Sequence, residues 1–284
     1  MKDKALTASK MKKYAARTVV YLLAIAVAVT AFYPFFVMII SATHDNYNIV
    51  AKINVLPGNQ LAVNYARLTQ NIELYRGIFN SVILAVAVTA VQNYFTAMAA
   101  YAFSKFEFKG RNVLFGVVMV AMMLPGQLGI IGFYKEIQAL NLLNSYFTLI
   151  VPTIANCFAV FFYKQYLDGG LPNELLEAAV VDGCGELKIF HRIVIPLMVP
   201  ALVTQGVMTF IGNWNSYLTP LIVLNDKKKM TLPLMIATVR DSTHADYGAQ
   251  YVGMLVSVIP MVIVFCFASR IIMEKISIGA AVKG

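Results

Sequence analysis

Residues 171–196 read LPNELLEAAVVDGCGELKIFHRIVIP and separate two strongly apolar segments. Pro172 suits the first turn of a helix, where its missing N–H group costs nothing. Glu174 and Glu177 follow early in that helix, where the helix dipole favours negative charge. The segment therefore predicts a helix that starts near residue 172, outside the apolar runs on either side.

Local signals also predict where this helix ends. Gly183 suits the position after the last helical turn, which often needs a left-handed backbone. A second short helix is expected over about 186–194, and Pro196 is expected to end it before the next apolar run. The apolar residues expected on one face of the first helix are Leu175, Leu176, Ala179 and Val180. By spacing alone, this helical hairpin is either a docking element for a soluble partner or an ordinary amphipathic connector.

The composition is that of a membrane protein. Of the 284 residues, 59% are hydrophobic and 13% are charged, whereas about a quarter of the residues are charged in soluble domains. The charges lie between apolar runs that are long enough to cross about 30 Å of hydrocarbon, which satisfies no peptide group, so each run is expected to be a helix. The sequence predicts an all-α polytopic membrane protein with six transmembrane helices, near 19–40, 81–103, 113–133, 146–162, 201–224 and 251–268.

The distribution of Lys and Arg predicts the orientation. The formal net charge is +9, and a cluster of basic residues precedes the first apolar run. That run is too long for a cleaved signal peptide, so we interpret it as an uncleaved first span. Lys and Arg are more frequent in loops on the side of the N-terminus, although the lysines at 227–229 run against this trend. We expect a multi-pass protein of the cell (inner or plasma) membrane with both termini in the cytoplasm, and no binding of nucleic acid.

The sequence shows no sign of chemistry of its own. It lacks the G-x-x-x-x-G-K-[ST] phosphate loop of ATPases. No Asp, Glu, Lys or Arg lies near the middle of a predicted span, which argues against an ion-driven carrier. The three cysteines and three histidines are scattered and match neither a disulfide framework nor a metal site. We therefore expect no catalytic residue, no bound cofactor and no metal in this chain.

The 171–196 segment also contains a longer pattern: Glu-Ala-Ala, three residues, Gly, nine residues, Ile-x-x-Pro. This pattern resembles the docking loop of ABC importer permeases. The residues at the positions of the family are Glu177, Ala178, Ala179, Gly183, Ile193 and Pro196, and Asp182 precedes the glycine as it often does there. The resemblance implies that the loop over 167–200 lies in a groove of an ATPase subunit, where Glu177 and Asp182 pair with basic groups.

Three further stretches resemble carbohydrate importers of this family. YAFSKFEFKG at 101–110 is similar to the turn after their second span. NWN at 213–215, followed by PL at 220–221, resembles their fifth span, although Ser216 stands where relatives often carry an acidic residue. GAAVKG at 279–284 is similar to the end of the maltose-type second permease subunit, and a flexible cytoplasmic tail is expected there.

The resemblance implies a type I ABC importer permease, which is a non-catalytic membrane subunit. Its implied partners are a second permease subunit, a cytoplasmic ATPase dimer, an extracytoplasmic solute-binding protein and a sugar or oligosaccharide. Mg-ATP would be bound by the partner ATPase and not by this chain. The implied division is an N-terminal part over 1–78, with the basic segment, first span and external loop, and a five-helix permease core over 79–284.

The fifth span is the predicted path of the solute. Side-chain amides and aromatic rings, which together suit a sugar, occur close together in its sequence. The residues are Asn213, Trp214, Asn215 and Tyr217. Hydrogen bonding between helices is the alternative for these four residues. Asn156 and Gln205 lie in apolar runs and are expected to form hydrogen bonds between helices.

Prolines predict irregular helices, and the residues leave other functions open. Pro125-Gly126 in the third run and Pro260 in the sixth predict breaks or kinks. One alternative function is a secondary carrier or channel for a small polar solute that works without ATP. Another is a membrane enzyme for lipid-like substrates, which would need acids and histidines gathered at the membrane face.

Overall fold

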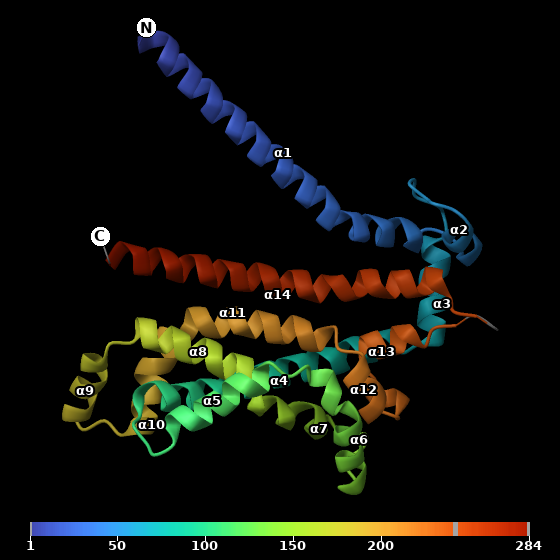
Figure 1. Cartoon of the computed structure of the whole chain (residues 1–284). Helices are drawn as coiled ribbons and strands as arrows, with labels where there is room; N and C mark the ends of the chain where they lie inside the picture. The colour runs from blue at the N-terminus through green and yellow to red at the C-terminus, as the bar shows by residue number, and fades with distance from the viewer. Residues whose placement is uncertain (1, 241–243, 283–284) are drawn as a thin grey trace. The chain divides into compact units, whose positions relative to one another are not determined.

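The computed structural model describes residues 2–240 and 244–282. Within these ranges every named element is a helix, and their order along the chain can be followed in Figure 1. An isolated bridge between Arg240 and Ala245 is the one extended pairing found there. The prediction of an all-α protein is therefore confirmed.

The chain divides into two compact units. The first unit consists of Met1–Asn71 and Val239–Val256, and the second of Ile72–Thr238 and Ser257–Gly284. The division that the sequence suggested, after residue 78, does not coincide with these units, because a late segment clusters with the N-terminal one. As a functional boundary it stays a prediction.

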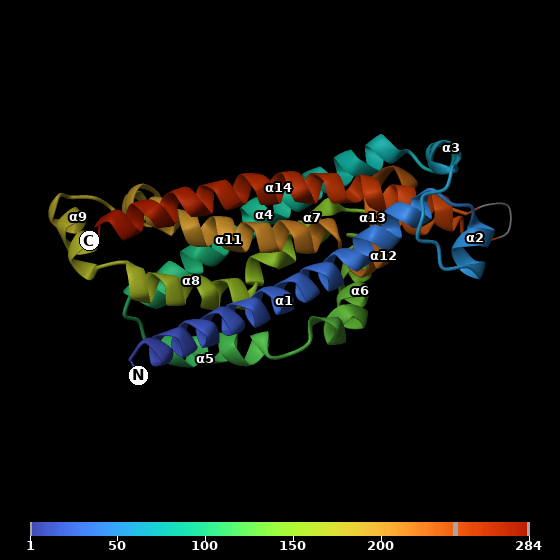
Figure 2. The ribbon, with the colours of Figure 1, turned by 90° about the horizontal axis from the view of Figure 1, so that it is seen from above.

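The first unit contains α1 (Lys2–Ala42), α2 (Asn46–Ala51), α3 (Leu61–Asn71) and the beginning of α14 (Tyr247–Val282), which are labelled in Figure 2. Asn64 on α3 is fully buried and donates hydrogen bonds to the carbonyl oxygens of Ala42 and His44, both at 2.8 Å. Arg67 Nε lies 3.1 Å from a carboxylate oxygen of the buried Asp246, which caps the start of α14. These contacts join α3 to the end of α1 and to the first turn of α14.

The second unit contains the other helices. Those before the 171–196 segment are α4 (Leu74–Lys105), α5 (Arg111–Met122), η1 (Gly126–Gly129), α6 (Ile130–Ala139), α7 (Tyr146–Ile150), η2 (Val151–Ala155) and α8 (Cys157–Gly170). Those that follow are α9 (Asn173–Val181), α10 (Glu186–Ile189), the π-helical η3 (Phe190–Val194), α11 (Ile195–Trp214), α12 (Leu218–Val223), η4 (Lys227–Lys229) and α13 (Leu232–Ala237). In Figure 1, α9 and α10 lie at one end of α11, and α12 lies at the other.

The membrane spans can be assigned from helix length and hydropathy. Within the described residues, four segments are long and apolar enough to cross a membrane: Arg17–Ala42, Leu74–Lys105, Glu186–Trp214 and Tyr247–Met273. Two bent pairs pass the same test, Arg111–Met122 with Gly126–Ala139 and Tyr146–Ala155 with Cys157–Gly170. If each pair counts as one span, the total is six, and each predicted run corresponds to one of these segments.

Two spans differ from their predicted form. The third is not continuous over 113–133, because the chain bends by 91° between α5 and α6, at the break that Pro125-Gly126 predicted. The fifth does not cover 201–224, because its helix begins at residue 186 and ends at Trp214. The N–H groups of the next residues close that end with turn bonds to Ile211 and Asn213, and α12 then starts as a separate helix.

Two expectations concern the last span. The break expected at Pro260 is absent, because α14 continues through it, and a kink there stays a prediction. The flexible tail expected over 279–284 is helical as far as Val282, and Lys283 and Gly284 lie outside the described residues.

Pro196 does not end a helix, contrary to the prediction. The elements α10, η3 and α11 follow one another without a gap. Proline lacks the N–H group that an α-helix needs and clashes with the preceding turn. The wider turn of η3, in which the N–H group of Ile195 bonds to the carbonyl oxygen of Phe190, lets the helix pass this point. Pro196 then lies in the first turn of α11, where it is tolerated.

The core of the second unit lies where α4, α8 and α11 meet. Small side chains let these helices approach closely, and they are Ala97, Ala100, Ala159 and Ala201. Gln92 Nε2 on α4 donates to Thr209 Oγ1 on α11 at 2.7 Å, and Asn156 Nδ2 lies 3.5 Å from Gln92 Oε1. Asn156 therefore makes the predicted contact between helices, whereas the buried Gln205 finds no hydrogen-bond partner among the described residues.

Candidate functional site

The helix α9 ends in a turn that requires glycine. Gly183 has a φ of 76°, in the left-handed region. Its N–H group donates to the carbonyl oxygen of Val180 at 2.9 Å, and that of Cys184 donates to the carbonyl oxygen of Ala179 at 3.0 Å. This pair of bonds is the Schellman motif. A Cβ atom at Gly183 would meet nothing within 4 Å, so the need for glycine comes from the backbone conformation and not from space.

Two side chains seat the segment on the helix bundle. Ala179 on α9 and Ile189 on α10 are buried in the cluster that also contains Tyr101 on α4 and Leu167 on α8. Ile193, in η3, packs against the same cluster. Ala179 and Ile193 of the predicted pattern therefore have a packing role, because they attach the hairpin to the core of the spans.

Polar side chains near the end of α4 also hold the hairpin, through hydrogen bonds in addition to the apolar packing. Lys105 Nζ donates to the carbonyl oxygen of Leu171 at 2.6 Å and to Asn173 Oδ1 at 2.9 Å. The hydroxyl of Tyr101 donates to a carboxylate oxygen of Glu186 at 3.3 Å. The sequence singled out the 101–110 stretch by resemblance but did not predict these contacts, because they join residues far apart in the chain.

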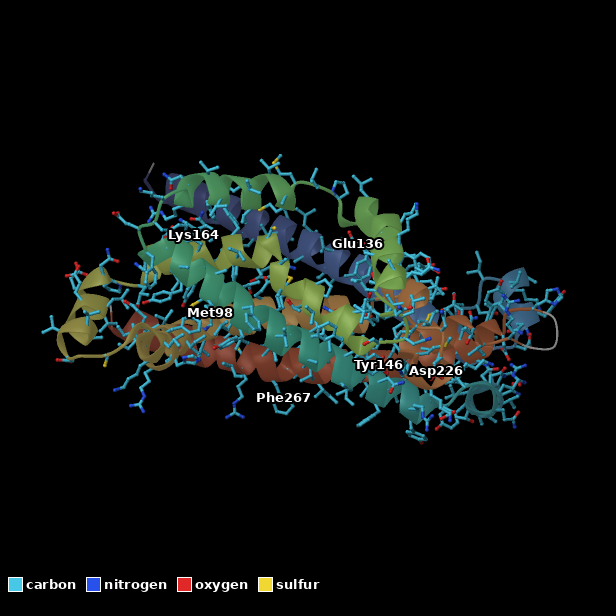
Figure 3. The ribbon with its side chains drawn as sticks, turned by 90° about the horizontal axis from the view of Figure 1, so that it is seen from below. Met98, Glu136, Tyr146, Lys164, Asp226 and Phe267 are labelled. Atoms are coloured by element: carbon cyan, nitrogen blue, oxygen red, sulfur yellow. The ribbon has the colours of Figure 1, made fainter. Side chains whose placement is uncertain are left out.

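A further anchor lies just before the hairpin. Asp168 on α8 accepts a hydrogen bond from Ser104 Oγ at 2.6 Å and forms an ion pair with Lys164 Nζ at 2.5 Å. Lys164, labelled in Figure 3, also lies over the ring of Phe115 on α5, 4.8 Å from its centroid. The start of the hairpin is thereby tied to three helices, and no sequence signal beyond the spacing of Lys164 and Asp168 pointed to this.

The outer side of the hairpin exposes aliphatic residues. Val181 is 86% exposed and Leu187 is 66% exposed, and Leu175 and Val180 are exposed as well. The single apolar face that the sequence predicted is therefore divided, with Leu176 and Ala179 toward the core and the other two outward. The other exposed residues of the pattern are Glu177, Ala178, Asp182, Gly183 and Pro196. The result is a firmly held aliphatic surface with carboxylates beside it.

The predicted solute-path residues do not form one surface. Trp214 is 1% exposed, donates from Nε1 to the carbonyl oxygen of Ser257 at 3.0 Å and stacks on Phe210. It therefore packs inside the unit and forms a hydrogen bond to another helix, α14, which is the alternative that the sequence left open. Asn213 donates to the backbone of its own helix, and Asn215 contacts the sulfur of Met261.

Tyr217 has a different environment. It is 41% exposed and lines a pocket of about 770 Å³ together with residues of α6, α7 and α12. Asn156 and Ser216 line the same pocket. Among the predicted path residues, Tyr217 alone lines this pocket.

Known proteins resemble this chain over most of its length. The arabinooligosaccharides transport system permease protein AraQ of Bacillus subtilis (strain 168) is 35% identical over 222 residues, which cover 78% of each chain. The lactose transport system permease protein LacG of Rhizobium radiobacter is 30% identical over 243 residues, 86% of this chain and 88% of that one. A chain in the crystal structure of a bacterial ABC transporter involved in the import of the acidic polysaccharide alginate has the same fold, with a TM-score of 0.76, 21% identity and coverage of 89% and 95%.

The family is shown by a match over much of the chain. Residues 92–277, which include the hairpin and most of the core helices, match the pattern of one family of membrane proteins. This match does not fit a membrane enzyme or a carrier that works alone. The chain belongs to the family of binding-protein-dependent transport system inner membrane components, as the non-catalytic permease of an ABC importer.

Proposed function

We propose that this chain forms part of the path for a sugar or oligosaccharide and couples to a separate ATPase through the 167–200 loop. The similarity to permeases for arabinooligosaccharides and for lactose supports the carbohydrate class. The family membership supports two kinds of partner, an ATPase and a solute-binding protein. A second permease subunit would complete the membrane part as a heterodimer, and Mg-ATP would bind to the ATPase dimer.

One observation carries the docking role: a hairpin with a fixed backbone exposes aliphatic side chains. Val181 and Leu187 have most of their surface accessible, while the backbone below them is held by the Schellman turn and by Lys105. Burial of apolar surface is favourable by about 25 cal/mol per Å². A groove on the ATPase would supply that burial, and Glu177 and Asp182 would pair with basic groups at its edge.

The packing of the hairpin supports a way to transmit force. Ala179, Ile189 and Ile193 belong to the cluster or pack on it, together with residues of α4, α8 and α11. Because a packed cluster moves as a body, closure of the ATPase dimer on ATP would displace the hairpin and these three helices together. The chain would thus change the orientation of the path without performing chemistry.

The orientation of the chain in the membrane is indicated by basic residues close to the hairpin. Lys105 and the exposed Lys109 lie at the end of α4 that holds the hairpin, and Arg111 starts α5 there. Basic residues gather on the cytoplasmic side of membrane proteins. We therefore propose that the hairpin and both termini are cytoplasmic.

A matched pair of substitutions tests the docking role. Gly183→Thr places a branched side chain at a φ of 76°, whereas Gly185→Thr places it at a φ of −73°, at the N-cap of α10, where threonine is accepted. The left-handed conformation costs an ordinary residue about 1–2 kcal/mol. In proteoliposomes with the complete transporter, we expect Gly183→Thr to insert normally but to lower ATP-driven uptake about tenfold, and Gly185→Thr to behave as wild type.

Coupling is read from two measurements on the same vesicles. In the Gly183→Thr variant, uptake of labelled sugar should fall while ATP hydrolysis continues, so that hydrolysis is no longer coupled to uptake. Gly183→Asn should restore this coupling in part, because asparagine tolerates the left-handed region. Normal uptake and normal stimulation in the Gly183→Thr variant would contradict the docking role.

A further inference from the structure

Three interruptions of the helices meet at one pocket in the second unit. The first is the 91° bend between α5 and α6, the second is the 43° bend before α8, and the third separates α11 from α12. The pocket of about 770 Å³ is lined from these places by Gln127, Asn156 and Tyr217, among others. Its volume lies in the range of small-molecule sites. Irregular backbone at membrane depth is tolerated where it is buried in protein or lines a water-filled cavity.

The position of the pocket along α4 indicates its depth. Asn156, which lines the pocket, contacts Gln92 near the middle of α4. The helix rise puts Gln92 about 20 Å from Lys105 at the hairpin end and about 18 Å from Asn80, in the second turn of α4. The distance of about 38 Å between Lys105 and Asn80 matches a bilayer with part of its headgroup regions. The pocket therefore lies near the middle of the membrane.

Polar side chains at the pocket are left without protein partners. The amide of Gln127 and the hydroxyls of Ser216, Tyr217 and Thr219 form no hydrogen bond with any other described residue, although all four residues line the pocket. An unpaired polar group in a membrane is costly unless water or a ligand satisfies it. Four such groups at one pocket are what a solute with many hydroxyl groups requires.

The lining also determines which charge the solute carries. None of the described residues that line the pocket is Asp, Glu, Lys or Arg. An ionised solute would lose its hydration there and gain no opposite charge, which is expensive at low dielectric. The aromatic rings of Phe133 and Tyr217 add apolar surface to the same lining. The chemistry suits an uncharged sugar and disfavours an acidic one.

We propose that this pocket is a transient binding site for uncharged sugar units on their way through the permease. Gln127, Ser216, Tyr217 and Thr219 would supply its hydrogen bonds. The proposal rests on the proposed import of a carbohydrate and adds the site within this subunit and the charge class of the solute. It also distinguishes this chain from the alginate importer that shares its fold, since alginate is an acidic polysaccharide.

The test uses the complete transporter with its binding protein in proteoliposomes. The probes are lactose and arabinobiose as neutral disaccharides and digalacturonate as an acidic one. The test variant combines Gln127→Ala with Tyr217→Phe, which removes two partners and keeps the ring. The control is Leu128→Ala, because Leu128 is on the same η1 turn, is 76% exposed and does not line the pocket.

We expect wild-type vesicles to import a neutral disaccharide and to exclude digalacturonate. Loss of two hydrogen bonds should lower uptake about tenfold or more, while the stimulation of ATP hydrolysis by the binding protein persists. The Leu128→Ala variant should behave as wild type. Uptake of digalacturonate by the wild type, or full uptake by the double variant, would overturn the proposal. Simultaneous loss of uptake and of stimulated hydrolysis in the double variant would also overturn it, since that pattern reports damage to coupling and not the loss of a sugar site. This outcome would not contradict the docking role of the hairpin.

Discussion

The helix α4 holds one loop near each of its ends through hydrogen bonds from a polar side chain, and the two loops expose different kinds of side chain. At one end, Lys105 binds the backbone of the hairpin at Leu171. At the other end, Asn80 Nδ2 donates to the carbonyl oxygens of Lys228 at 3.0 Å and Met230 at 2.9 Å. Each loop is thus fixed by a polar side chain of a helix that is distant in sequence. The hairpin exposes aliphatic side chains, and the other loop, at 225–230, exposes ammonium groups.

The 225–230 loop is held by further hydrogen bonds. Asn144 Oδ1 accepts hydrogen bonds from the N–H groups of Asn225 and Asp226. The hydroxyl of Tyr146 donates to the carbonyl oxygen of Lys229 at 2.9 Å, and Figure 3 labels Tyr146 and Asp226 in this region. The lysines that conflict with the positive-inside trend therefore belong to a well-ordered loop, and their exposure does not come from a loose chain.

The difference indicates what each end can recognise. Aliphatic surface contributes only when a partner covers it closely, so the hairpin suits a tight and lasting interface. Exposed ammonium groups act over about a Debye length and weaken with salt, so the opposite loop suits long-range attraction. The hairpin and the 225–230 loop both have a backbone held by hydrogen bonds. They differ in the side chains that they expose, and therefore in the partners that they suit.

The largest effect is expected from a charge in the aliphatic surface. Val181→Glu should weaken binding of the purified ATPase to the permease by about a hundredfold or more, because the carboxylate would be buried without a partner. The fold should be unchanged, since Val181 is almost fully exposed. Val181→Met keeps an apolar side chain and should bind nearly as wild type. Equal affinities for the two variants would show that this surface is not part of the interface.

A smaller effect is expected from the anchor below that surface. Lys105→Met removes two charge-assisted hydrogen bonds and should destabilise the seated hairpin by about 1.5–3 kcal/mol. Hydrogen exchange should become faster over 171–176 and stay unchanged over 227–231. Lys109→Met, at an exposed lysine four residues later, serves as the control. Faster exchange at both ends of α4 would mean that the two loops are not held independently.

The smallest effect is expected at the opposite end. Asn80→Ala removes two neutral hydrogen bonds and should destabilise the 225–230 loop by about 1–2 kcal/mol, with faster exchange over 227–231 alone. Lys228→Gln should change thermal stability by less than about 0.5 kcal/mol, because its ammonium group is exposed and the loop is held through the backbone. A larger loss from Lys228→Gln than from Asn80→Ala would reverse this assignment.

Local features of the hairpin could be predicted because their causes are local. A helix end with Gly183 in the left-handed region depends on a few neighbouring residues, and the prediction is confirmed. The break at Pro125-Gly126 is of the same kind. Pro196 was misjudged, because the π-helical turn that accommodates it lies upstream and is supported by the packing of Phe190 and Val194. The docking role of Glu177 and Asp182 stays a prediction.

Features that join distant parts of the chain could not be predicted. Trp214 has the composition of a sugar contact, yet it is buried under α14 through its bond to Ser257. The pocket is formed by helix breaks near residues 126, 156 and 216, and each break alone gives no sign of the other two. Only the arrangement of helices brings them together.

By itself, the sequence determined the class of the protein, since long apolar runs require helices in a membrane and the 177–196 pattern marks the family. It also determined the end of α9, because the preference of glycine for a left-handed turn is a property of one residue. Tertiary structure alone decided which residues hold the hairpin, which apolar side chains stay exposed and where unpaired polar groups meet. Those properties depend on neighbours brought close by helix packing, and spacing along the chain does not specify such neighbours.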